Sequence, residues 1–318
     1  MRTTFRAALA AIALTAVLAG CGDDDGTDAD ASQESTTEST TTTAPAATTE
    51  PSDPDASEPT GTVPERIVSM TPTGTETLYA VGAGDAVVAV DDYSTFPEGA
   101  PVTDLSAFEP NVEAIADHDP DLVLLSGDNE ATAAALEELD IDVLLLQAPT
   151  DLDGAYEQMR QIGEATGHAE EAEQLVADVQ DGIAEVVEST GGAGEGLTYY
   201  YELDPTYYSV TSATFIGQLL GLLGLENIAD EAQAEASDYP QLSAEYIIQQ
   251  DPDLILLADT KCCAQDAAAV AGRDGWSTLQ AVQGKGVVEL DDDIASRWGP
   301  RIVDLLEVVS EAAQRIAA

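Results

Sequence analysis

The sequence predicts an α/β protein of two Rossmann-like lobes joined by a single long α-helix, with a ligand cleft between the lobes. One helix-and-strand pattern occurs twice, in residues 113–125 and 245–257, and a long amphipathic helix is expected between the copies. In each copy a short helical stretch meets an Asp-Pro-Asp step, which disfavours helix. An apolar run follows that is typical of a strand buried on both faces. One larger sheet that holds both units is the alternative.

The first 63 residues are expected to serve export and anchoring. Arg2 and Arg6 precede an apolar stretch that is short for a membrane span, so residues 1–20 are interpreted as a signal peptide. The Leu-Ala-Gly-Cys run that ends at Cys21 resembles a bacterial lipobox, which implies a lipid on Cys21. An ordinary secretory signal with an incidental cysteine is the alternative. Residues 21–63 are acidic and rich in Thr, Ser and Pro without apolar periodicity, which predicts a disordered tether.

Residues 64–150 are expected to form the first lobe, because strands and helices alternate there as in a parallel sheet. The apolar runs predict strands at residues 66–68, 87–90, 122–125 and 142–146. Between the first two strands, residues 71–75 are predicted to be a loop. Residues 76–81 are predicted to form a short helix that ends at the glycines after it.

Residues 151–190 are predicted to be helical and to include the helix between the lobes. Within residues 169–189, apolar side chains recur three or four positions apart, and glycines bound the stretch on both sides. Packing of this helix on one sheet, like any other helix, is the alternative. Residues 191–318 are expected to form the second lobe. Its predicted strands are 197–201, 254–257 and 286–290, and its predicted helices include 214–223 and 302–316.

The chain is strongly acidic: 10 Lys and Arg stand against 61 Asp and Glu, for a formal net charge of −51. Phosphates of nucleic acids and anionic lipid surfaces repel such a chain, so neither is expected as a partner. We expect a monomer. The sequence has no dinucleotide or phosphate-loop pattern and no convincing Ser-His-Asp order, and its abundant carboxylates single out none, so an enzyme is not expected.

The ligand site is predicted from one rule: the loops at the carboxyl ends of parallel strands line the ligand crevice. Although aromatic residues are only 5% of the chain, several fall in these loops, together with some of its few cations. Such a lining suits a bulky, partly apolar ligand with negative or carbonyl groups. The predicted ligand-binding residues are Thr71, Pro72, Tyr93, Phe96, Tyr207, Lys261, Arg297, Trp298 and Arg301. For any one aromatic residue, plugging the end of a lobe is the alternative.

Cys262 and Cys263 are adjacent in a chain that is expected to be exported, where oxidation is the default. A bond between neighbours is strained, because consecutive α-carbons are closer than ordinary disulfides prefer. We favour this vicinal disulfide at the cleft, with two reduced thiols or a metal site as alternatives. No metal site or cofactor is predicted, because His118 and His168 lie away from the crevice ends, although haem held by a tyrosine stays open.

Residues 64–318 resemble the substrate-binding lipoproteins of ABC importers for cobalamin and iron complexes. The most specific matches are residues 66–76, 91–97 and 297–301. The Tyr-Ser-x-x-Pro motif within residues 91–97 resembles the cobalamin-binding branch of the family. The cysteine pair departs from the best-known members. The resemblance implies a permease and its ATPase as partners, with one docking carboxylate on each lobe, Glu76 and Glu226. For both, a solvated carboxylate near a helix end is the alternative.

These expectations combine into one function. The chain is expected to be a lipid-anchored, extracytoplasmic receptor that captures a cobalt corrinoid in the cleft and delivers it to the permease. Tyr93 and Trp298 are expected to stack on the ligand, while the cations in the crevice loops meet its amide, phosphate or carboxylate groups. A ferric siderophore or haem is the alternative ligand and would depend more on those cations. A thiol/disulfide redox lipoprotein that uses the cysteine pair is the alternative of another class.

Overall fold

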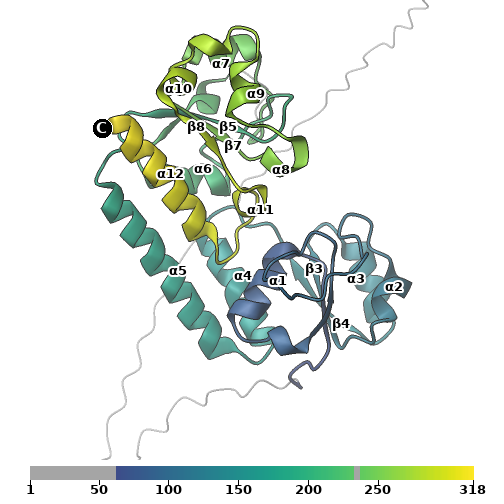
Figure 1. The fold of residues 1–318 in the computed structure, drawn as a ribbon. Coiled ribbons are helices and arrows are strands. Elements are labelled where there is room, and N and C mark those ends of the chain that lie inside the picture. Colours follow the sequence, from purple (N-terminus) through teal and green to yellow (C-terminus); the bar gives the residue numbers. More distant parts are fainter. Residues whose placement is uncertain (1–61, 233–236) are drawn as a thin grey trace, which may run out of the picture. The chain divides into compact units, whose positions relative to one another are not determined.

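The computed structural model describes residues 62–232 and 237–318. The predicted signal peptide, the lipidation site at Cys21 and nearly all of the tether therefore lie outside the described residues. The described chain forms two four-stranded sheets, each surrounded by helices (Figure 1). These two sheets confirm the prediction of two α/β lobes, and the alternative of one larger sheet is wrong. Within the two described ranges, no helix is both long enough and apolar enough to cross a membrane.

The first lobe is built on a parallel sheet with the strand order β2-β1-β3-β4. Its strands are β1 (Ile67–Ser69), β2 (Val87–Val90), β3 (Leu122–Ser126) and β4 (Asp142–Leu146). Its helices are α1 (Pro72–Ala80), α2 (Val112–Ala116) and α3 (Glu130–Glu137), with a 3₁₀ turn at Gly84–Ala86. In β3, Leu122 and Leu124 pack into one core and Val123 and Leu125 into another. The strand is thus buried on both faces, which explains its unbroken apolar run.

The second lobe repeats this plan with the parallel order β6-β5-β7-β8. Its strands are β5 (Thr198–Glu202), β6 (Glu226–Asn227), β7 (Leu254–Leu257) and β8 (Val287–Glu289). Its helices are α6 (Phe215–Gly221), α7 (Ala244–Gln250), α8 (Thr260–Cys263), α9 (Ala267–Ala271), α10 (Gln280–Gly284), α11 (Asp292–Ala295) and α12 (Ile302–Ala317), with 3₁₀ turns at Ile228–Glu231 and Trp276–Thr278. The repeated sequence pattern forms α2 and β3 in one lobe and α7 and β7 in the other. Both strands hold the third place in their sheets.

Two helices, α4 (Leu152–Ala165) and α5 (Ala169–Thr190), lie between the two sheets along the chain. The long helix predicted at 169–189 is therefore confirmed as α5, which Gly191 ends in the left-handed region with φ of 61°. Ala172, near the start of α5, packs in a core of the first lobe, whereas Val179 and Ile183 pack in the core of the second. Helix α4 packs against one part of α5, and α12 packs against another part of α5 (Figure 1). Helix α5 therefore packs in the cores of both lobes.

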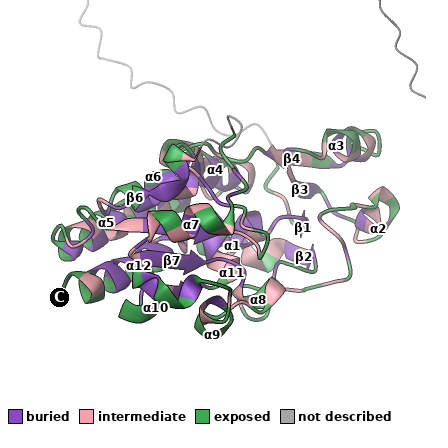
Figure 2. Ribbon diagram, turned by 90° about the horizontal axis from the view of Figure 1, so that it is seen from above, coloured by how far each residue is buried: buried purple, intermediate pink, exposed green. Residues whose placement is uncertain are grey.

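The start of α1 corrects the loop predicted at residues 71–75. The helix begins at Pro72, with Thr71 as its N-cap, because proline fits the first helical turn, where no N–H partner is needed. Thr75 Oγ1 donates to the carbonyl oxygen of Thr71 at 3.1 Å, so the hydroxyl bonds within the helix instead of breaking it. Glu76 thereby lies in the middle of a helix. Figure 2 shows β1 and β3 of this sheet as mostly buried and the outer helices α2 and α3 as partly exposed.

Candidate ligand-binding site

A cavity of about 640 Å³ lies where loops from both lobes meet. The first lobe contributes side chains after β1, β2 and β3, and the second lobe contributes side chains after β7 and β8. This is the edge that the rule for parallel sheets predicts, because the carboxyl ends of all these strands point to it. The lining residues are Met70, Thr71, Pro72, Thr73, Tyr93, Ala107, Phe108, Ser126, Asp128, Lys261, Cys262, Asp292, Asp293, Ser296, Arg297 and Trp298.

Six of the nine predicted ligand residues line this cavity, and three do not. The six are Thr71, Pro72, Tyr93, Lys261, Arg297 and Trp298. Tyr207 instead stacks on Trp276 within the second lobe, with 5.7 Å between the ring centroids. Phe96 lies under the guanidinium of Arg301, which is 4.1 Å from its ring centroid. For Tyr207, the structure supports the alternative of a packing role, because its ring faces a core residue of its own lobe.

Phe108 is the lining residue that the sequence reading missed most clearly. Its side chain is 79% exposed, and its ring meets Tyr93 edge-on with a centroid distance of 5.3 Å. Two exposed aromatic rings that meet at a cavity suit a ligand that covers them. The available signal was its place in the long connection between β2 and α2, which also contains Tyr93. The ligand residues predicted in that connection, Tyr93 and Phe96, both lie near its start.

The cations at the cavity are all bound to carboxylates. Lys261 Nζ pairs with Asp291 and, at 2.7 Å, with Asp293. Partial burial opposes the positive charge of Lys261, but these two carboxylates outweigh it and raise its pKa. Arg297 Nη2 donates to Asp293 at 2.8 Å and to the carbonyl oxygen of Tyr93 at 3.0 Å. The cations that were predicted to meet amide, phosphate or carboxylate groups of a ligand therefore already have carboxylate partners within the protein.

Glu76 binds both arginines of the 297–301 segment. Its Oε1 accepts from Arg297 Nη1 at 2.9 Å and from Arg301 Nη2, and its Oε2 accepts from Arg301 Nε at 2.9 Å. The residue is only 4% exposed. The expectation of an accessible carboxylate, whether for docking or merely solvated, is therefore wrong for Glu76. These hydrogen bonds cross from the first lobe to the second, and they raise the pKa of Arg301.

Glu226 differs from Glu76 because it is exposed, at the start of β6. Its docking role stays a prediction. His118 and His168 lie outside the cavity lining, and the ring nitrogen Nδ1 of His168 is 2.8 Å from the carbonyl oxygen of Thr166. In the part of the chain that the structure describes, no group of three or more His, Cys, Asp and Glu side chains is arranged to hold a metal ion.

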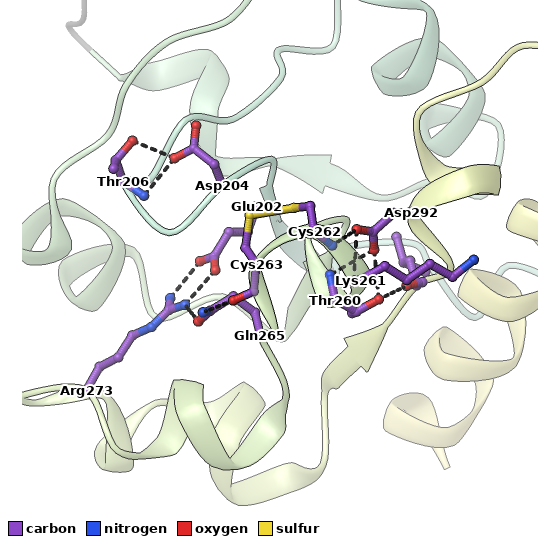
Figure 3. The surroundings of a disulfide bond; sticks show 11 residues. Glu202, Asp204, Thr206, Thr260, Lys261, Cys262, Cys263, Gln265, Arg273 and Asp292 are labelled. Atoms are coloured by element: carbon purple, nitrogen blue, oxygen red, sulfur yellow. Dashed lines mark hydrogen bonds and ion pairs between the residues drawn. A yellow bond between two sulfur atoms is a disulfide. The ribbon is translucent and has the colours of Figure 1, made fainter. Parts of the chain in front are cut away.

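The structure joins Cys262 and Cys263 by a disulfide on the cavity wall (Figure 3). The two residues form the end of α8, directly after β7. Asp292 holds the start of this short helix, since its carboxylate accepts from the backbone N–H groups of Thr260, Lys261 and Cys262 at 2.8 to 2.9 Å. The disulfide thus lies at the end of a short helix whose start is held by Asp292 of α11.

The sequence of residues 67–294 matches the family described as periplasmic binding protein. This chain belongs to the periplasmic binding protein family. An uncharacterized ABC transporter substrate-binding lipoprotein of Bacillus subtilis, YvrC, is 32% identical to it over 95% of both chains. A cobalamin-binding protein of Halobacterium salinarum is also 32% identical, over 82% of this chain and 73% of that protein.

Solved structures share the fold of this periplasmic binding protein. The periplasmic vitamin B12-binding protein BtuF of Vibrio cholerae matches with a TM-score of 0.64 and 24% identity, covering 80% of this chain and 98% of that chain. The periplasmic haem-binding protein RhuT of Roseiflexus sp. RS-1, in its apo form, matches with a TM-score of 0.70 and 22% identity, covering 80% and 99%. At these identities the likeness concerns the fold alone, and the two neighbours bind different ligands.

Close to the disulfide, this periplasmic binding protein has two buried carboxylates, Glu202 and Asp259, and one arginine, Arg273 (Figure 3). Arg273 donates to both oxygens of Glu202, at 2.6 and 2.5 Å, and to Gln265 at 2.7 Å (Figure 3). Asp259 is fully buried, and neither of its carboxylate oxygens has a hydrogen-bond partner among the described residues. Burial, together with the charge of Glu202, raises the pKa of Asp259 to about 7. Near pH 7, protonated and ionised Asp259 are therefore both populated.

Proposed function

We propose that this chain is the substrate-binding protein of an ABC importer and that it captures a cobalamin-like corrinoid in the cavity between its lobes. It would be lipid-anchored through Cys21 on the outer side of the cell membrane, act as a monomer, perform no catalysis and deliver the ligand to a permease driven by an ATPase. The name of the Bacillus relative supports the transport role, and the name of the Halobacterium relative supports the ligand.

The observation that carries the choice of ligand is the charge state of the cavity. Lys261 and Arg297 are the cationic side chains that line it, and carboxylates bind both. Asp128 and Asp292 add further negative charge. An anionic chelate would therefore meet carboxylates without a free cation, whereas a corrinoid with its neutral amide rim would not be repelled.

The aromatic side chains at the cavity also support a corrinoid as the ligand. Tyr93, Phe108 and Trp298 line the cavity, and the first two are exposed. The apolar parts of a corrin ring would cover these aromatic rings and displace the water on them, which favours binding in proportion to the apolar area removed from water. We expect the ligand to lie between the rings of the first lobe and Trp298 of the second.

Calorimetric titration with cyanocobalamin tests the proposal, with a ferric hydroxamate and haem as comparisons. We expect micromolar or tighter binding of cyanocobalamin and markedly weaker binding of the other two. Binding of an iron chelate or haem in preference to cyanocobalamin would replace the corrinoid by a ferric siderophore or haem and leave the transport role in place.

Delivery to the permease is proposed to use Glu226, whose carboxylate is exposed. A charge reversal, Glu226→Arg, should lower uptake by cells without changing the affinity of the purified protein for the ligand. The matched control is Glu195→Arg, another carboxylate at the surface of the same lobe. Uptake that falls equally in both variants, or in neither, would remove Glu226 from the proposal.

A thiol/disulfide redox role is the second candidate, because the Cys262–Cys263 disulfide lies on the cavity wall and Cys262 is exposed. That role requires reactive thiols during turnover. The disulfide would take two electrons from a dithiol substrate, which becomes a disulfide while Cys262 and Cys263 become thiols. Oxidation of one equivalent of a dithiol, with both cysteines open to alkylation afterwards, would favour this role. A protein that is alkylated at these positions only after reduction, and that turns over no dithiol, fits the binding role instead.

A further inference from the structure

We propose that Glu76 sets the charge preference of the cleft: by binding Arg297 and Arg301, it makes the site select neutral or cationic metal chelates against anionic ones. This inference rests on the proposed capture of a metal chelate and goes beyond it, because it names the residue that decides the class of chelate. Its basis is the pairing of the arginines, their burial and the remaining charges of the cavity.

The first step is that both carboxylate oxygens of Glu76 are bound to arginine. Each of its carboxylate oxygens accepts from an arginine, and Oε1 accepts from both. The backbone of Gly299 passes close by: a β-carbon added there would lie 3.3 Å from Oε2 and 3.5 Å from Thr73 Cγ2. Glycine at this position therefore lets the 297–301 segment close tightly over the carboxylate.

The second step is that both guanidinium groups already have partners within the protein. Arg297 also donates to Asp293 and to the carbonyl oxygen of Tyr93, and it is buried. Arg301 has the ring of Phe96 against its guanidinium, and it lies outside the cavity lining. An anionic ligand that took the place of Glu76 on these guanidinium groups would leave that carboxylate buried and unpaired, at a high cost.

The third step is that two arginines are a large share of the cationic residues in so acidic a chain. Lys and Arg number only 10 in 318 residues, and two of them serve one buried carboxylate. A site built to attract an anion would leave at least one of these guanidinium groups open to the ligand. The structure has the opposite arrangement: Glu76 binds both guanidinium groups, and Asp293 is a second partner of Arg297.

The test replaces Glu76 by its neutral isostere, Glu76→Gln, and titrates wild type and variant with a ferric tris-catecholate, which is strongly anionic, and with neutral cyanocobalamin. The matched control is Asp128→Asn, which removes one negative charge from the cavity wall without releasing an arginine. We expect Glu76→Gln to strengthen binding of the ferric catecholate by about tenfold or more and to exceed the gain in Asp128→Asn. Equal gains in the two variants, or none in Glu76→Gln, would overturn the inference.

A second measurement needs no ligand and no variant. A dicarbonyl reagent that modifies free guanidinium groups, read by mass spectrometry, should modify Arg297 and Arg301 of the wild-type protein far more slowly than exposed Arg315. Modification of all three at the same rate would overturn the inference, whatever the titrations give. Failure of wild type to bind cyanocobalamin would reject the proposed ligand alone, because arginine modification and the catecholate titration still decide the role of Glu76.

Discussion

Trp298 Nε1 donates a hydrogen bond of 2.9 Å to Gln158 Oε1, so helix α4 orients an aromatic wall of the cavity. Gln158 is buried and does not itself line the cavity. Its neighbours on α4, Ala155 and Met159, pack in the core of the second lobe. The indole plane is therefore set by the connecting helix and not only by the loop that carries Trp298.

Replacing Gln158 tests this orientation. Gln158→Met keeps the length of the side chain but removes the acceptor of the indole N–H, which should cost about 1 kcal/mol of stability and weaken binding of cyanocobalamin several-fold. Gln161→Met, one turn further along α4, is the control. Denaturant unfolding and calorimetry on both variants check the prediction, and equal affinities would show that the loop alone holds Trp298.

Phe108 should contribute to ligand binding but not to stability. Its ring is mostly exposed, so Phe108→Ala removes little buried area and should change the free energy of unfolding by less than about 0.5 kcal/mol. The affinity for cyanocobalamin should fall about tenfold, because a stacking surface is lost. Leu139→Ala, another exposed apolar residue that does not line the cavity, should leave the affinity unchanged. A large loss of stability in Phe108→Ala would contradict the exposed position.

Truncation of Glu76 should destabilise the fold more than truncation of an exposed acid. Glu76→Ala leaves Arg297 and Arg301 without their shared carboxylate, and breaking such a buried pair costs about 3–5 kcal/mol. Glu173 pairs with Arg160 at 3.0 Å, but its side chain is 63% exposed, so Glu173→Ala should cost at most about 1 kcal/mol. Urea unfolding compares them. Similar losses would mean that solvent reaches the pair that connects the lobes.

Asp259 should make stability depend on pH. Its pKa of about 7 in the folded protein lies above the value of about 3.9 for an unfolded chain, so the folded state binds this proton more tightly. The resulting stabilisation is complete below about pH 4 and is lost as the pH rises through 7. The difference in unfolding free energy between Asp259→Asn and wild type should therefore favour the variant more at pH 8 than at pH 5. Unfolding free energies at several pH values check this, and a difference that does not vary with pH would contradict it.

The prediction from sequence succeeded where local chemistry decides the structure. The Asp-Pro steps and the apolar runs after them indicated β3 and β7, and the spacing of apolar residues indicated α5, because both patterns follow from periodicities of a few residues. It failed at α1, where threonines and a glycine suggested a loop. There the proline at the first helical position and hydroxyl bonds within the helix favour a helical turn.

The candidate site was predicted only from the rule that the loops at the carboxyl ends of parallel strands line the ligand crevice. That rule placed Tyr93, Lys261 and Trp298 at the cavity. It could not distinguish them from Tyr207, which follows a strand end too but turns into the core of its own lobe. It also overlooked Phe108, because a long connection returns to the cavity after leaving it. Which way a loop side chain turns depends on packing that no local pattern records.

By itself, the sequence determined the two-lobe α/β fold, the long connecting helix and the edge of the sheets where a ligand would bind. These features depend on local propensity and on the geometry of parallel sheets. Only the tertiary structure decided that Glu76 binds Arg297 and Arg301, which lie 221 and 225 residues further along the chain. Such a pairing depends on how the two lobes meet, and a chain of many carboxylates and few cations offers no local pattern that selects one partner over another.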